Sequence, residues 1–187
     1  MAPLPGASLS RRLIGTMSVR TGLIIPIVAM ATLACPGSRK AELEIYSNSL
    51  DTLDDVLNRT GAALDTGTSH DGQASIRFEV TEPRTIQLAE IEPEAVENAR
   101  LIYRACLKTQ DLSGQAYLEM WCVVEGMGEF FSRALHAPVS GTTDWVTQET
   151  PFFLEKGQRA KMVKLNLVVT GAGTVWVDDM GLVKVDR

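Results

Sequence analysis

Apolar and polar side chains alternate along most of the chain from residue 74 onward. In residues 74–80, Ile76, Phe78 and Val80 share one face, and polar side chains stand between them. The same period of two recurs between turn residues at 85–91, 101–109, 115–124, 145–153, 162–170, 174–177 and 181–185. This alternation is typical of antiparallel strands that bury one face. It predicts an all-β fold of two antiparallel sheets packed face to face.

An earlier segment has a different period. Leu50, Leu53, Val56 and Leu57 recur at helical spacing, with aspartates near the start of the run. This spacing predicts a short helix near residues 50–58.

The first 34 residues contain three arginines, no acidic residue and an uncharged apolar run at 22–34. A membrane-spanning helix needs about 20 apolar residues, and this run is shorter and contains Pro26. A basic flank, a short apolar stretch and a small-residue exit are typical of a secretory signal peptide that starts at Met1 or Met17. We therefore predict a signal peptide at 1–34, a lipidation site and tether at 35–41, and one folded domain at 42–187.

The residues at the end of this leader, Thr32-Leu33-Ala34-Cys35, resemble the lipobox of bacterial lipoproteins. The resemblance implies an exported protein of the cell envelope, held at the membrane by a lipid on Cys35. Two alternatives are a secreted protein in which Cys35 is incidental and an uncleaved membrane anchor.

The folded domain is acidic. Positions 35–187 hold 15 Lys and Arg against 23 Asp and Glu, which leaves a net charge of −8. Binding to a phosphate backbone depends on Lys and Arg that neutralise phosphates. Nucleic acid is therefore not expected as a partner.

Cys106 and Cys122 are the two cysteines of the domain. If 101–109 and 115–124 pair as a hairpin around 111–114, the two cysteines lie about four residues apart along the ladder, too far for a disulfide. They also lack the CxxC spacing that is typical of zinc sites. We expect both to be buried as small apolar side chains.

Five side chains are candidates for a carbohydrate site: Tyr103, Tyr117, Glu119, Trp121 and Trp145. Tyr117, Glu119 and Trp121 share one face of their strand, and the hairpin register puts Tyr103 opposite Trp121. Aromatic faces stack on sugar rings, and planar polar groups pair with hydroxyls. The alternative is that both faces of the sheet are covered and the aromatic rings fill the core.

Three segments resemble carbohydrate-binding jelly-roll modules of the galactose-binding-like type. Residues 173–183 read GTVWVDDMGLV, as in the last strand pair of such modules, and 69–76 read SHDGQASI, similar to an early strand entry. The DWV at 144–146, followed by TPF at 150–152, is similar to a middle strand. The resemblance covers roughly residues 60–187 and implies a jelly-roll sandwich.

The resemblance also implies a structural calcium ion held by Asp178 and Asp179, with groups near Asp71. Calcium takes six to eight oxygen ligands, which carboxylates and backbone carbonyls supply. The alternative is that one aspartate caps a turn and the other is solvated.

The chain shows no nucleophile motif, and the spacing of Glu119, Glu125 and Glu129 defines no acid–base pair. The prediction is therefore an exported, lipid-anchored, non-catalytic carbohydrate-binding module. The alternative is a structural or protein-interaction domain of an envelope lipoprotein, which a sheet face covered by residues 42–66 would favour.

Overall fold

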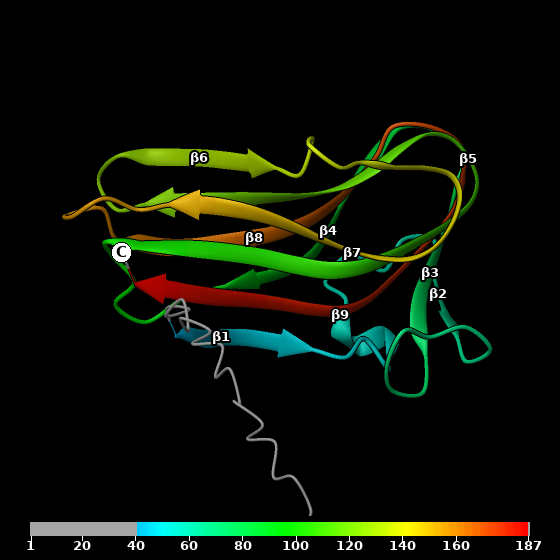
Figure 1. Ribbon diagram of the computed structural model, residues 1–187, viewed down its shortest axis with the longest axis horizontal. Helices are drawn as coiled ribbons and strands as arrows, with labels where there is room; N and C mark the ends of the chain where they lie inside the picture. Colours follow the sequence, from blue (N-terminus) through cyan, green and yellow to red (C-terminus); the bar gives the residue numbers. More distant parts are fainter. Residues whose placement is uncertain (1–40, 187) are drawn as a thin grey trace, which may run out of the picture. The chain divides into compact units, whose positions relative to one another are not determined.

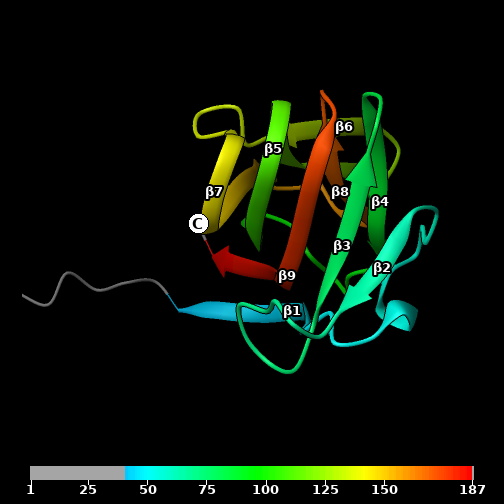
Figure 2. The same ribbon diagram turned by 90° about the vertical axis from the view of Figure 1, so that its right-hand side faces the viewer.

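The longest strand, β5 (Ala99–Val124), belongs to both layers of the fold (Figures 1 and 2). Its first half pairs with β7 (Val139–Phe153) and β9 (Gly173–Asp186), and its second half pairs with β6 (Gly128–Arg133) and β8 (Ala160–Val169). The computed structural model describes residues 41–186, and every strand pair in this range is antiparallel. The predicted all-β jelly-roll sandwich is confirmed.

Four further strands complete the two layers. In the first layer, β2 (Ala62–Asp65) pairs with β3 (Ser75–Val80), β3 pairs with β9, and β1 (Glu42–Asn48) lies along the other half of β9. In the second layer, β4 (Arg84–Ile91) is an edge strand beside β8. The second layer therefore has the order β4–β8–β5–β6.

The hairpin expected around residues 111–114 is wrong, because the chain there bends without reversing. Asp111 has a φ of 52°, and the pairing of β5 with β7 shifts register on both sides of Leu112. Aspartate tolerates this left-handed backbone better than most residues, and a bulge bends a strand without ending its pairing. A Cβ on Gly114 would overlap the backbone of Gly171, so the bend also needs a residue without a side chain.

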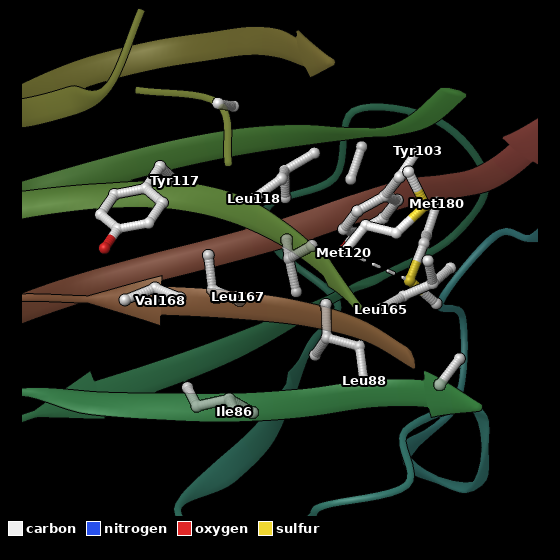
Figure 3. Close-up of a cluster of buried hydrophobic side chains, with 14 of the residues drawn as sticks. Ile86, Leu88, Tyr103, Tyr117, Leu118, Met120, Leu165, Leu167, Val168 and Met180 are labelled. Carbon is white, nitrogen blue, oxygen red and sulfur yellow. Dashed lines mark hydrogen bonds between the residues drawn. The ribbon is translucent and has the colours of Figure 1, made fainter. Parts of the chain in front are cut away.

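The core lies between the layers and consists of the apolar side chains that alternate inward from the strands. Its largest fully buried members include Tyr103, Phe78, Ile86, Leu118 and Leu165. Figure 3 shows part of this cluster, with Tyr103 beside Met180. Each buried side chain of this size stabilises the fold by about 1.5–3 kcal/mol.

Both cysteines of the described domain are free and buried, as expected. Cys122 is fully enclosed, and burial raises the pKa of its thiol to about 11. It therefore behaves as a small apolar core residue.

The expected helix near residues 50–58 is reduced to a single 3-10 turn, η1 (Leu53–Asp55). Leu50 has a φ of 57°, and the carboxylate of Asp51 accepts the backbone N–H groups of Gln73 and Ala74 at 2.6 and 2.9 Å. These bonds tie the start of the segment to another loop and prevent helical propagation. Between residues 41 and 186, no helix is long and apolar enough to cross a membrane.

Candidate functional site

The side of the β4–β8–β5–β6 sheet that faces away from the core carries polar and aromatic side chains. We call it the Glu119 face, and its residues are Gln87, Glu119, Trp121, Phe131, Arg133, Lys164 and Asn166. The strand register brings them into two rows. Asn166 and Arg133 stand on either side of Glu119, and Lys164 and Phe131 stand on either side of Trp121. Paired residues of antiparallel strands share a face, so these side chains are neighbours.

Glu119 is the buried centre of this face. One of its carboxylate oxygens accepts hydrogen bonds from Trp121 Nε1 at 2.8 Å and Asn166 Nδ2 at 3.2 Å. The other accepts from Arg133 Nε at 2.6 Å. The side chain of Glu119 is only 5% exposed, whereas that of Arg133 is 37% exposed. The acid therefore fixes the indole, the amide and the guanidinium in place, and it raises the pKa of Arg133.

Two aromatic rings stand on the same face. The Trp121 and Phe131 ring centroids are 5.1 Å apart at an angle of 44°, and the Arg133 guanidinium lies 4.5 Å from the Phe131 centroid. Phe131 is about half exposed, at 52%, and Trp121 is partly exposed. An exposed ring pair beside amide and guanidinium groups can stack on a sugar and hydrogen-bond its hydroxyls.

The face continues past Trp121 into a shallow depression. Val123, the next outward residue of β5, lines this depression of about 600 Å³ together with Met127 and Arg159. Nearer to Trp121, Lys164 Nζ pairs with Glu129 at 3.0 Å. The outward side of β5 therefore leads from Trp121 toward this depression.

Residues 42–66 lie beside the sheet edge and in the other layer. β1 pairs with β9, and the N–H groups of Leu57 and Asn58 bond to the Leu88 and Gln87 carbonyls on the edge strand β4. Residues 42–66 therefore do not cover the Glu119 face, as they would in the alternative of a purely structural domain.

Tyr103 has a different place from that expected, whereas Tyr117 stands on the expected side of β5 but is largely covered. Tyr103 is fully buried in the core, where its hydroxyl lies 3.8 Å from Met180 Sδ, so it does not belong to the Glu119 face. Tyr117 stands on the outward side of β5 but is only 8% exposed, at the other end of the cluster drawn in Figure 3. The expected register placed Tyr103 with Trp121 because it assumed a hairpin.

Trp145 lies in the other layer, on β7. Its ring meets the His70 ring edge-on, with centroids 5.9 Å apart. The structure thus brings Tyr117, Glu119 and Trp121 together and separates Trp145 and Tyr103 from them.

Asp178 is fully buried and anchors a loop through its hydrogen bonds. One oxygen accepts the backbone N–H of His70 at 2.6 Å and of Asp71 at 3.2 Å, and the other accepts that of Asp179 at 2.8 Å. Burial raises the pKa of Asp178, and these N–H groups oppose the rise. Asp71 and Asp179 are exposed.

These contacts bear on the calcium that the resemblance implied. The groups that face the Asp178 carboxylate are hydrogen-bond donors, whereas Ca²⁺ requires six to eight oxygen ligands. These contacts give the Asp178 carboxylate a role as the anchor of the 70–71 loop. A calcium ion at Asp71, Asp178 and Asp179 stays a prediction.

Phe131 and Arg133 were not among the sequence candidates. Both lie on β6, which follows Gly126-Met127-Gly128, and the alternation of Phe131 and Arg133 on one side was the available signal. Only the pairing of β6 with β5 shows that they complete the site around Glu119.

No known protein-family profile matches the chain, and no curated protein matches it. Among solved structures, the chain is similar to the CBM22-1 xylan-binding domain of Paenibacillus barcinonensis Xyn10C, with 15% identity, a TM-score of 0.57, and coverage of 80% of this chain and 99% of that one. It is also similar to the xylan-binding domain from CBM 22 formally called x6b, with 11% identity, a TM-score of 0.54, and coverage of 77% and 96%.

A third similar structure is the C-terminal family 22 carbohydrate binding module of Clostridium thermocellum Xyn10B. It has 12% identity, a TM-score of 0.53, and coverage of 76% of this chain and 94% of that one. The three likenesses establish that the chain has the fold of these carbohydrate-binding modules.

Proposed function

We propose that the domain is a non-catalytic carbohydrate-binding module that holds a polysaccharide on the Glu119 face. The observation that carries the proposal is the partly exposed Trp121–Phe131 ring pair beside a buried acid that orients three polar side chains. Carbohydrate sites combine such rings with a few fixed polar groups. The charge of Glu119 is balanced by Arg133, so the face does not require a charged ligand.

Xylan is the class of ligand that we propose to test first. Two of the similar modules are named as xylan-binding, and the Glu119 face extends past Trp121 toward the depression at Val123. A chain of several sugar units would contact Trp121 and continue along this surface.

The experiment is a glycan array followed by calorimetric titration with xylohexaose, on the full 187-residue chain. The matched variants are Trp121→Ala and Trp145→Ala, because both tryptophans are partly exposed and they lie on different layers. We expect Trp121→Ala to weaken binding at least about tenfold, as loss of an aromatic anchor does at interfaces. Trp145→Ala is expected to bind as the wild type does.

Two results would overturn the proposal. One is the absence of any glycan bound by the folded wild-type chain. The other is equal binding by wild type and Trp121→Ala, which would place the ligand elsewhere. Urea unfolding of each variant shows whether a lost signal reflects a lost fold.

We also propose that the domain is exported and held in the cell envelope by a lipid on Cys35. The leader and Cys35 lie outside the described residues, so the support is the sequence pattern at 22–35. Expression in a bacterial host with an alkyne fatty acid should label the wild type and leave Cys35→Ser unlabelled. Equal labelling of both, or none, would rule out lipidation at this residue.

A further inference from the structure

Three metal-ligating side chains converge on the first layer, away from the Glu119 face. They are His70 from the β2–β3 loop, Cys106 from β5 and Asp179 from β9. One ligand atom from each lies within 4.8 Å of the other two. Cys106 is buried, whereas His70 and Asp179 are exposed, so the cluster opens to solvent on one side.

Neighbouring groups contact the side chains of His70 and Cys106 and hold the backbone of Asp179. Asp178, which is fully buried, accepts the backbone N–H groups of both His70 and Asp179. The His70 ring also packs against Trp145. Thr147 Oγ1 lies 3.4 Å from Cys106 Sγ, where its hydroxyl can donate to a thiolate. Such supporting contacts orient metal ligands and raise the affinity for the ion.

We propose that His70, Cys106 and Asp179 bind a divalent transition-metal ion, for which zinc is the best chemical fit. Thiolate, imidazole and carboxylate are zinc ligands, whereas calcium takes oxygen ligands only. With metal–ligand bonds of about 2.0–2.3 Å, tetrahedral ligand atoms stand roughly 3.5 Å apart, so the three need to close by about 1 Å. Cys106 binds as the thiolate and releases its proton to solvent.

This ion would join three segments that are far apart in sequence. It would connect the loop at His70 to the central strand β5 and to Asp179 on β9. Asp179 has a φ of 48° and lies in a bulge, where the pairing of β9 with β5 shifts register. An ion that binds only the folded chain raises the free energy of unfolding. The gain grows with the logarithm of the ratio of the ion concentration to its dissociation constant. The site is independent of the proposed sugar binding, because it lies on the other layer.

The test uses Co²⁺ as a spectroscopic substitute for Zn²⁺, followed by competition with Zn²⁺. The full chain carries Cys35→Ser, so that Cys106 and Cys122 are the remaining thiols. We expect one equivalent of Co²⁺ to give a thiolate charge-transfer band, which disappears when Zn²⁺ displaces the Co²⁺ ion. We also expect Zn²⁺ to raise the melting temperature of the chain.

Matched variants assign the ligands. Cys106→Ala is expected to abolish the band and Cys122→Ala to keep it.

His70→Ala is compared with His136→Ala, and Asp179→Asn with Asp71→Asn. Asparagine tolerates the positive φ at 179, so this change removes the charge without straining the backbone. His70→Ala and Asp179→Asn should each lower the affinity at least about tenfold, and their two controls should not.

Three outcomes would overturn the proposal. They are a folded chain that shows no thiolate band, a band of equal strength in Cys106→Ala, and equal affinity in the His70→Ala and His136→Ala variants. Ca²⁺ serves as a separate titrant. One set of results would assign the region to calcium instead. In it, Ca²⁺ raises the melting temperature and Zn²⁺ does not, and the effect of Ca²⁺ is lost in Asp71→Asn and kept in Cys106→Ala.

Discussion

Glu119 and Asp178 are two buried carboxylates, one in each layer of the sandwich, and they differ in what surrounds them. Glu119 accepts hydrogen bonds from an indole, an amide and a guanidinium, all of them side-chain groups. Asp178 accepts three bonds from backbone N–H groups. Both acids are almost inaccessible to solvent.

The type of hydrogen-bond donor around the buried acid distinguishes a ligand-binding site from a structural contact that holds a loop. Two of the side-chain donors around Glu119, Trp121 and Arg133, are partly exposed, and their ring face and further N–H groups can meet a ligand. Backbone donors around Asp178 are used up in holding the 70–71 loop and the bulge at 179. A buried acid in a sheet therefore does not by itself mark a binding site.

Removal of the Asp178 carboxylate should have the largest effect on stability. In Asp178→Ala, three backbone N–H groups lose their acceptor, and at about 1 kcal/mol for each part-buried hydrogen bond the free energy of unfolding falls by about 3 kcal/mol. Urea unfolding measures the loss. Asp71→Asn is the matched control, with an expected change below about 0.5 kcal/mol because the side chain is exposed. A loss below about 1 kcal/mol in Asp178→Ala would contradict the anchoring role.

Removal of the Glu119 carboxylate should affect ligand binding more than stability. Glu119→Ala releases Trp121, Asn166 and Arg133 from their fixed positions, and we expect the affinity for xylohexaose to fall at least about tenfold, or about 1.4 kcal/mol. The stability loss should be smaller than in Asp178→Ala, since the partly exposed Arg133 can turn to water. Calorimetry and urea unfolding on both variants test this. Unchanged affinity in Glu119→Ala would remove Glu119 from the site.

Alternation predicted the core side of the sheets correctly because each strand there buries one face. It also placed Tyr117, Glu119 and Trp121 on one side of β5, as the structure does. Alternation is a local property, and within a single straight strand it is sufficient.

The errors arose where strands bend between layers. Residues 111–114 read as a turn, but Asp111 adopts a positive φ in a bulge, and β5 continues into the second layer. The side of Tyr103 relative to Trp121 depends on that bulge, so Tyr103 was assigned to the wrong environment. The pairing of β5 with β7 shifts register three times between Leu107 and Gln115. A net shift of one residue reverses the face of every side chain beyond it.

Contacts between distant segments were beyond the reach of the sequence pattern. Arg133 reaches Glu119 only through the pairing of β6 with β5. His70, Cys106 and Asp179 come from three separate segments with no spacing that suggests a shared site. Cys106 and Cys122 were compared for a joint zinc motif, whereas the groups near Cys106 lie on a loop and on β9.

The smallest expected effect concerns two arginines, one in each layer. Arg104 pairs with Glu42 at 3.0 Å and Glu149 at 2.8 Å, and all three side chains are about one-third to one-half exposed. Such exposed pairs contribute about 0–1 kcal/mol, so Arg104→Ala should lower stability by less than about 1 kcal/mol. It should leave the affinity for xylohexaose unchanged.

Arg133→Ala is the matched variant, because its partner Glu119 is buried and its guanidinium lies over Phe131. We expect a loss of affinity of about three- to tenfold, which corresponds to one lost charge-assisted contact. The two variants are compared by calorimetry with xylohexaose, and by urea unfolding to confirm that each is folded. Equal affinities of Arg104→Ala and Arg133→Ala would mean that the ligand does not use the guanidinium, and that Arg133 serves only to neutralise Glu119.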